Sequence, residues 1–237
     1  MFNNKIFYPG IIRKTVVAFG NLFSNIYIER RKDDSVTGEK VQTLQIPIAY
    51  APKEKWIVRT EQDPSLENHT YVTMPRMSFE ITGYRYDSSR KVPKMNKIVC
   101  NNGTTTKVTF APVPYIIDFQ LYILTKTQED ALQIIEQILP NFGPEYTISI
   151  NAVPAMNIVQ DIPITLQSVA FDDEYEGTFD RRTVIHTLTF TAKVNLFNYV
   201  GDADVIYTAI ANVEQPATTF TAIGDPETHE VVSETWE

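Results

Sequence analysis

An alternation of apolar and polar side chains between Val184 and Leu196, which only Ile185 breaks on the polar side, constrains the fold more than any other feature of this chain. One set of alternate positions is apolar apart from a histidine, and consists of Val184, His186, Leu188, Phe190, Ala192, Val194 and Leu196. The other set is polar, and consists of Thr187, Thr189, Thr191, Lys193 and Asn195. Successive side chains of a β-strand point to opposite faces, so the pattern predicts a long antiparallel strand with one buried face.

Several further segments also have the composition of strands. They are residues 25–30, 41–50, 76–86, 107–125, 146–150 and 162–166. Pro112 and Pro114 interrupt the longest of them, and prolines at such positions indicate a kink near a sheet edge. Between two of these strands, residues 83–105 are rich in Gly, Asn and Lys and predict a loop.

Two amphipathic helices are predicted. Residues 11–25 carry apolar side chains at helical spacing, although Gly20 costs about 1 kcal/mol relative to alanine in a helix. The second helix, over residues 128–139, follows Thr127, which suits the N-cap position. Pro52 suits the start of a third, short helix. In the helix over 128–139 we expect an apolar stripe of Ala131, Ile134, Ile135 and Ile138, broadened by Leu132 and Leu139. The outward-facing residues are expected to be Gln133, Glu136 and Gln137.

The pattern as a whole predicts an α+β fold. Residues 1–200 are expected to form a single domain with a mostly antiparallel β-sheet and two or three helices. The chain has 237 residues, of which 43% are hydrophobic and 21% charged, so it can bury a sizeable core without disulfides. No apolar run is long enough for a transmembrane helix, and the N-terminus lacks a signal-peptide pattern. The lone cysteine, Cys100, fits a protein assembled in a reducing cytoplasm.

Negative charge is concentrated at the C-terminal end. Residues 201–237 contain 8 of the 29 acidic residues and no Lys or Arg, so the other 21 acidic residues balance the 21 basic ones. A neutral body argues against nonspecific nucleic-acid binding, which needs a basic surface. Residues 201–237 therefore predict an extended acidic arm, which is either solvated or lies on a basic neighbour.

Catalytic signatures are absent from the sequence. The three histidines, His69, His186 and His229, share no spacing motif. His186 lies on the apolar face of a strand, where we expect a hydrogen-bonded core histidine and not a catalytic one. Cys100 has no nucleophile signature, and neither phosphate-binding glycine loops nor a G-x-S-x-G motif occurs. We therefore expect no enzyme activity and no cofactor.

One acidic segment, Asp172 to Gly177, partly imitates a calcium-binding loop. It has acidic residues at alternate positions and glycine at the sixth, but Thr183 stands where the twelfth position requires Glu. An acidic turn before the next strand explains the segment better. A metal site is the less favoured interpretation, and it would use Asp172, Asp173, Glu174 and Glu176.

A basic segment between residues 83 and 97 is the main candidate for an interaction site. It contains one acidic residue, two tyrosines and five basic residues. The basic residues are Arg85, Arg90, Lys91, Lys94 and Lys97. Arginine with tyrosine is typical of protein interfaces, so we expect a loop that docks on an acidic protein surface. A solvated hairpin tip is the alternative.

Several segments resemble one family. Residues 12–23, 46–55, 74–80 and 84–97, and less sharply the helix over 128–139, are similar to the tail sheath stabiliser and completion (tail terminator) proteins of T4-like contractile-tailed phages. The resemblance covers residues 1–200. It implies a virion structural protein whose hexameric ring caps the tail tube and the last sheath disc, stabilises the extended sheath, and offers a surface to the neck of the filled head.

The resemblance also implies partners and a location. The partners are further copies of the chain, the tail sheath and tail tube proteins, and neck or head-completion proteins, with no membrane and no sequence-specific nucleic acid. The location is the head-proximal end of the virion tail, after assembly in the host cytoplasm. We expect the basic 83–97 segment and the acidic 201–237 arm to pair between copies, so that salt, or truncation after Gly201, weakens the ring.

Two alternatives remain open at this stage. The first is a neck or head-completion connector that contacts or gates DNA, which salt-dependent DNA affinity would favour. The second is a metal-dependent hydrolase that uses the acidic residues between 172 and 176, which metal-dependent thermal stabilisation would favour.

Overall fold

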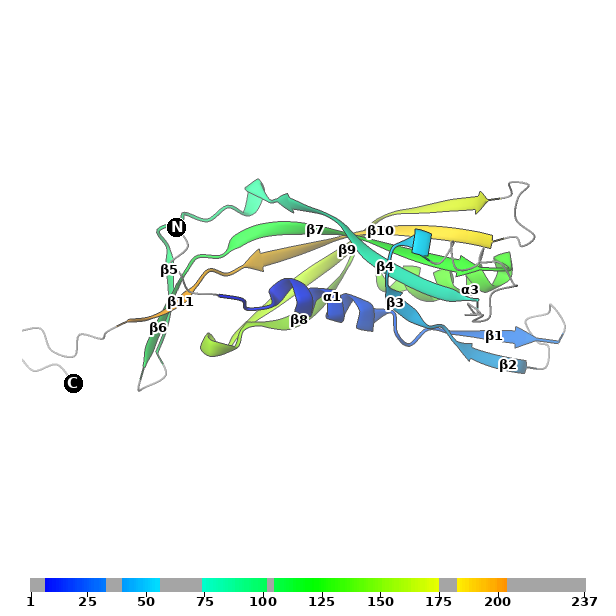
Figure 1. Cartoon of the computed structure of the whole chain (residues 1–237), viewed down its shortest axis with the longest axis horizontal. Helices are drawn as coiled ribbons and strands as arrows, with labels where there is room; N and C mark the ends of the chain where they lie inside the picture. Colours follow the sequence, from blue (N-terminus) through cyan, green and yellow to red (C-terminus); the bar gives the residue numbers. More distant parts are fainter. Residues whose placement is uncertain (1–6, 33–39, 56–73, 102–104, 175–182, 204–237) are drawn as a thin grey trace, which may run out of the picture. The chain divides into compact units, whose positions relative to one another are not determined.

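The long alternating strand lies in the interior of a six-stranded sheet in the computed structural model of this chain (Figure 1). The structure describes residues 7–32, 40–55, 74–101, 105–174 and 183–203. The order in the sheet is β3 (Ile48–Tyr50), β4 (Arg76–Tyr86), β7 (Val113–Thr125), β10 (Thr183–Leu196), β9 (Ile158–Glu174) and β8 (Glu145–Val153). All neighbouring pairs are antiparallel except β3 with β4. The predicted α+β fold with a mostly antiparallel sheet is confirmed.

Two smaller sheets extend this architecture. The strands β1 (Tyr27–Arg31) and β2 (Lys40–Gln45) pair with each other, and a three-stranded sheet has the order β11 (Val200–Ala203), β6 (Thr106–Phe110) and β5 (Lys97–Asn101). The predicted loop over 83–105 is therefore only partly correct, because a 3₁₀ turn, η1 (Ser88–Arg90), and strand β5 lie within it. Residues 1–204 group into one compact unit. Of the predicted arm, the residues from 204 onward lie outside the described part of the chain.

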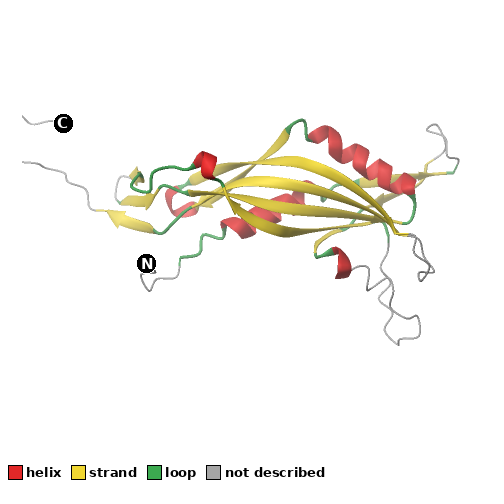
Figure 2. Cartoon of the chain, turned by 90° about the horizontal axis from the view of Figure 1, so that it is seen from above, coloured by secondary structure: helices red, strands yellow, loops and turns green. Residues whose placement is uncertain are grey.

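Two helices pack on the sheet at the predicted positions, α1 (Ile11–Leu22) and α3 (Gln128–Ile138) (Figure 2). The helix α1 contacts β8 and β3, whereas α3 contacts β7, β10 and β1. The Thr127 side chain accepts a hydrogen bond from the backbone N–H of Asp130, which confirms the predicted N-cap. Residues 53–55 are also helical, directly after Pro52.

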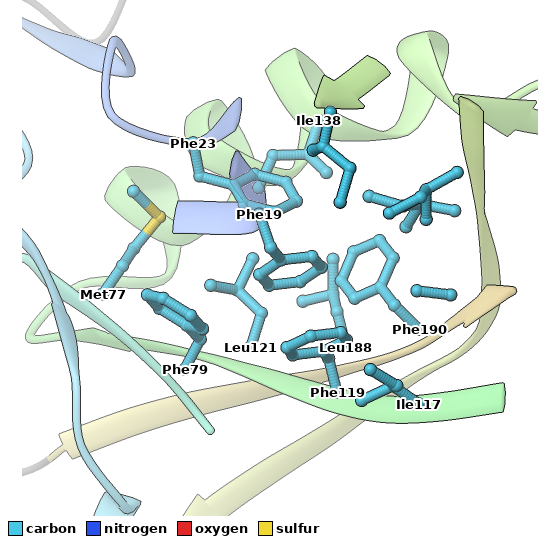
Figure 3. Packing of buried hydrophobic residues seen from close by; sticks show 14 of the residues in the cluster. Phe19, Phe23, Met77, Phe79, Ile117, Phe119, Leu121, Ile138, Leu188 and Phe190 are labelled. Atoms are coloured by element: carbon cyan, nitrogen blue, oxygen red, sulfur yellow. The ribbon is translucent and has the colours of Figure 1, made fainter. Parts of the chain in front are cut away.

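Phe19 of α1 lies at the centre of the main core (Figure 3). Its ring is fully buried and stacks on Phe119 of β7, with ring centroids 4.4 Å apart and planes 8° apart. Phe79 of β4 and Phe190 of β10 contact the same ring at centroid distances of 5.3 and 5.5 Å. One aromatic side chain of α1 therefore contacts three strands of the sheet. The buried side chains at alternate positions of β7 and β10 form the sheet side of this core.

Some local predictions were wrong. Leu132 and Leu139, which were expected to broaden the buried stripe of α3, are 48% and 40% exposed and so do not belong to it. Pro114 lies in β7, which is an interior strand and not an edge. It is tolerated there because it is the second residue of the strand and lies beyond Tyr115, the last residue of β7 that pairs with β4, so no ladder with β4 needs its missing N–H.

Candidate interaction surface

Arg85, the first of the predicted interaction residues, lies in β4 and binds a carboxylate of its own chain. Its Nε and Nη2 donate hydrogen bonds of 2.8 Å to the two carboxylate oxygens of Asp118 on β7. These hydrogen bonds and the negative charge raise the pKa of Arg85 above its ordinary value. The bidentate pair links two neighbouring strands, so the charge of Arg85 is already balanced within the subunit.

Arg90 is also held within the chain, by the turn η1. Its Nε donates a 2.6 Å hydrogen bond to Asp87, and its other nitrogens donate to the Asn195 side chain and the Tyr115 carbonyl, each at 3.4 Å. Hydrogen bonds from Ser89 and Arg90 lower the pKa of Asp87 to about 2. The turn is thereby anchored to the ends of β7 and β10.

The three predicted lysines are different. Lys91, Lys94 and Lys97 are exposed, and no described carboxylate lies within ion-pair distance of any of them. The Lys97 ammonium lies 5.6 Å from the ring centroid of Phe110, its partner in the pairing of β5 with β6. The structure therefore divides the five basic residues into two that hold the fold and three that are open to a partner.

Exposed apolar side chains occur in the same segment as these lysines. Met95 is 85% exposed and Val99 is 61% exposed. Val99 follows Lys97 by two positions in β5, so both lie on one face of the three-stranded sheet, together with Phe110. We call this region the lysine surface, and it consists of Lys91, Val92, Lys94, Met95, Lys97, Val99 and Phe110. Exposed apolar groups flanked by charge are typical of sites that bind proteins.

A second surface was not predicted, and it lies along β9. The strand β8 pairs with β9 only as far as Thr165, and a register irregularity in the pairing with β10 at Thr189/Phe190 leaves Gln167 as an extra residue. Beyond it, residues 167–172 are all exposed, including Val169 and Phe171. No strand in the described part of the chain pairs with this outer edge. We call residues 168–172 the open edge of β9.

The described part of the acidic segment, Asp172 to Glu174, is strand and not loop. Asp172 pairs with Ile185, and the strand β9 continues through Asp173 and Glu174. A calcium-binding loop beginning at Asp172 needs turn geometry at these positions, and an extended strand does not supply it. Residues 175–182 lie outside the described residues. Within the described ranges, no three His, Cys, Asp or Glu side chains gather as metal ligands.

His186 is buried, as the sequence indicated, but the hydrogen bond expected of a core histidine is not made by its Nδ1 within the described residues. His186 is 4% exposed, its ring lies against Phe171 with centroids 4.8 Å apart, and burial lowers its pKa. Its Nδ1 is buried without a hydrogen-bond partner among the described residues. Cys100 is half-buried and packs against the main core.

The outer side of α1 forms a shallow depression of about 500 Å³, lined in part by Tyr8, Arg13, Lys14 and Val17. Lys14 donates a hydrogen bond to the Asn151 carbonyl, so its charge is directed towards β8. None of the helices in the described residues combines the length and the apolar character that a membrane crossing requires.

Comparison with known proteins identifies the family of this chain. A family model described as T4-like virus Myoviridae tail sheath stabiliser matches residues 6–237, and so extends beyond the resemblance found over 1–200. The tail completion protein gp15 of Enterobacteria phage T4 is 30% identical over 210 residues, which cover 84% of this chain and 74% of that protein. The chain therefore belongs to the tail sheath stabiliser family of T4-like viruses, whose members are structural proteins of the phage tail.

Proposed function

We propose that copies of this chain form a hexameric ring that caps the tail tube and the last sheath disc. In this role the ring ends tail assembly, stabilises the extended sheath and provides the surface to which the neck and head are joined. The ring lies at the head-proximal end of the tail after assembly in the host cytoplasm. Its partners are the tail sheath and tail tube proteins and the neck or head-completion proteins, and the role is structural and needs no cofactor.

The proposal rests on the lysine surface, which is exposed in a chain that belongs to the tail sheath stabiliser family. A subunit of a closed ring uses two different patches, one for each neighbour, and it needs further surface for the proteins above and below. Exposed apolar side chains with unbalanced lysines supply such a patch. The name of the T4 relative, a tail completion protein, supports the position at the end of the tail.

Within this proposal the five basic residues have two roles. Lys91, Lys94 and Lys97 contact an acidic surface of a neighbouring protein. Arg85 and Arg90 act indirectly, because their ion pairs with Asp118 and Asp87 hold the strand and the turn that present the lysines.

The mass of the purified chain in solution tests the ring. Six copies of the 27.0 kDa chain give about 160 kDa by light scattering, and negative-stain images should show rings. Raising the salt concentration to about 1 M shortens the Debye length to about 3 Å, so we expect the midpoint concentration for assembly to rise.

The contrary result is a chain that stays monomeric alone and also in the presence of purified tail tube and sheath. Salt-dependent binding of that monomer to DNA would instead favour the neck or head-completion connector.

A further inference from the structure

The open edge of β9 has no strand of the described residues beside it. Its backbone groups on one side pair with β10, and those on the other side face no described strand. Globular proteins usually protect such edges with short strands, prolines or inward-pointing charges. Here the edge carries two large exposed apolar side chains, Val169 at 41% and Phe171 at 50%. An edge of this kind is suited to pairing with a strand of another chain.

A second open edge belongs to β5. This strand pairs with β6 on one side, and no described strand lies on its other side. Lys97 is its first residue, and Lys91 and Lys94 precede it. The open edge of β9, in contrast, leads into Asp172, Asp173 and Glu174. The two edges therefore carry opposite charge, which favours pairing between them over pairing of either edge with itself.

The charges also select the direction of the pairing. The acidic residues lie at the C-terminal end of β9, and the lysines lie at the N-terminal end of β5. These two ends meet only when the strands run antiparallel. A parallel arrangement would place the acidic end of β9 beside Asn101, away from the lysines.

One antiparallel register satisfies both the charges and the apolar side chains. With Asp172 opposite Lys97, Phe171 lies opposite Ile98 and Val169 lies opposite Cys100. Phe171 and Val169 are on the face of β9 that continues the buried face of β10, because they pair with His186 and Leu188. A slip of one residue in one direction would place Lys97 opposite Phe171. A slip in the other direction would place Lys97 opposite Asp173, but it would move Phe171 from Ile98 to Val99, on the other face of β5.

One chain cannot easily make this pairing with itself. The open edge of β9 adjoins the start of β10, whereas the three-stranded sheet follows the end of β10 through β11, as the strands in Figure 1 show. The 14 residues of β10 separate these ends by about 45 Å at about 3.3 Å per residue. Complementary edges at the two ends of a long strand are suited to contacts between successive copies.

We propose that the open edge of β9 pairs, antiparallel, with β5 of the adjacent copy. Asp172 then faces Lys97 of that copy, and the six-stranded sheet of one subunit continues into the three-stranded sheet of the next. This inference rests on the proposed ring and specifies its subunit contact. It assigns the acidic partner of the lysine surface to the end of β9 and not to the C-terminal segment 205–237.

Charge reversal tests the pairing of Asp172 with Lys97. We expect Lys97→Glu alone, and Asp172→Lys alone, to raise the midpoint concentration for assembly at least five-fold. We expect the double variant to return to within two-fold of the natural chain, because the pair is restored with its signs exchanged. The matched control is Lys126→Glu, an exposed lysine just beyond β7, which should leave assembly unchanged.

A variant with four neutralised carboxylates in the C-terminal segment tests the other acidic partner. It carries Glu227→Gln, Glu230→Gln, Glu234→Gln and Glu237→Gln in the full chain. We expect it to assemble like the natural chain. Loss of assembly in this variant, with normal assembly of Asp172→Lys, would overturn the proposed contact.

Disulfide cross-linking tests the register and does not require a stable ring. In a Cys100→Ser background, Ala170→Cys and Val99→Cys introduce cysteines that the proposed register places opposite each other. A chain with both cysteines should give a ladder of linked copies under oxidation. Mixed single variants should give dimers only, and each single variant alone should give none.

These outcomes separate the contact from the ring. Rings that form without the cross-link overturn the strand pairing and leave the proposed function in place. Cross-linked ladders from a chain that never closes into a hexamer overturn the hexamer and retain the pairing. Cross-linking of the Ala170→Cys variant with itself would show that two β9 edges pair, which also overturns the proposal.

Discussion

Gly20 lies inside α1 where the helix passes close to β4. A Cβ atom at this position would lie 2.9 Å from Cζ of Phe79, closer than side chains normally approach. Phe79 is only 5% exposed and is held between the rings of Phe19 and Tyr50, so it has little room to move. The glycine that lowers helix propensity in the sequence is therefore the residue that lets the helix approach the sheet.

We predict that Gly20→Ala destabilises the protein although alanine is the better helix former. Overpacking costs about 1–3 kcal/mol, which exceeds the gain of about 1 kcal/mol in helix propensity. Urea denaturation should show a lower free energy of unfolding than for the natural chain. The control is Val17→Ala on the exposed side of the same helix, which should change it by less than about 0.5 kcal/mol. A stabilised Gly20→Ala variant would contradict this account.

His186 predicts a pH dependence of stability. Burial lowers its pKa in the folded state below the value in the unfolded chain, so the unfolded state binds more protons as the pH falls. The contribution of this residue therefore makes the protein less stable as the pH falls below about 6.5, the ordinary value for histidine. His186→Leu should reduce the slope of unfolding free energy against pH between about 7.5 and 5.5. An unchanged slope would mean that other groups cause the dependence.

At the scale of elements, side chains of α3 satisfy the backbone edge of β1. The Gln133 amide accepts a hydrogen bond from the Glu29 N–H at 3.1 Å and donates one to the Glu29 carbonyl at 3.2 Å. Gln137 donates to the Tyr27 carbonyl at 2.7 Å. Gln137 is exposed, as predicted, and Gln133 is half-buried. The side chains of both residues also bind backbone groups of β1 that a neighbouring strand could otherwise bind. The ion pair of Arg30 with Asp130 adds a further link.

We predict that Gln133→Ala loosens the attachment of β1 to α3. The substitution removes two hydrogen bonds, each of which contributes about 0.5–1.5 kcal/mol to stability. The backbone N–H and carbonyl of Glu29 are therefore exposed to solvent more easily. Hydrogen exchange should be faster at the Glu29 amide, with little change in the six-stranded sheet. Glu136→Ala, on the exposed side of the same helix, is the control and should leave that exchange rate unchanged. Equal protection of the Glu29 amide in both variants would rule out the attachment.

At the scale of the whole molecule, opposite charges lie at two separate places. Residues 1–200 are formally neutral, yet the exposed lysines of the lysine surface lie at one place and the exposed Asp172 lies at another. Opposite patches on a neutral body favour head-to-tail contacts without attracting DNA along its length. The number of copies in a closed ring then depends on the angle between the two edges within one subunit.

Local sequence determined much of this protein. The alternation from Val184 to Leu196 established the strand and its buried face, because the two-residue period of a strand is a local property of the backbone. The Thr127 cap, the buried position of His186 and the family itself were also predicted, since each depends on nearby residues or on resemblance.

Only the tertiary structure decided which groups remain free to bind. The sequence does not distinguish the five basic residues from one another. In the structure Arg85 forms an ion pair with Asp118 and Arg90 forms one with Asp87, whereas Lys97 is exposed and has no described carboxylate within ion-pair distance. The open edge of β9 arises because β8 ends its pairing at Thr165, which no pattern within β9 reveals. Partners of a charge, or of a strand edge, are set by contacts between residues far apart in the chain, and a periodic pattern carries no information about them.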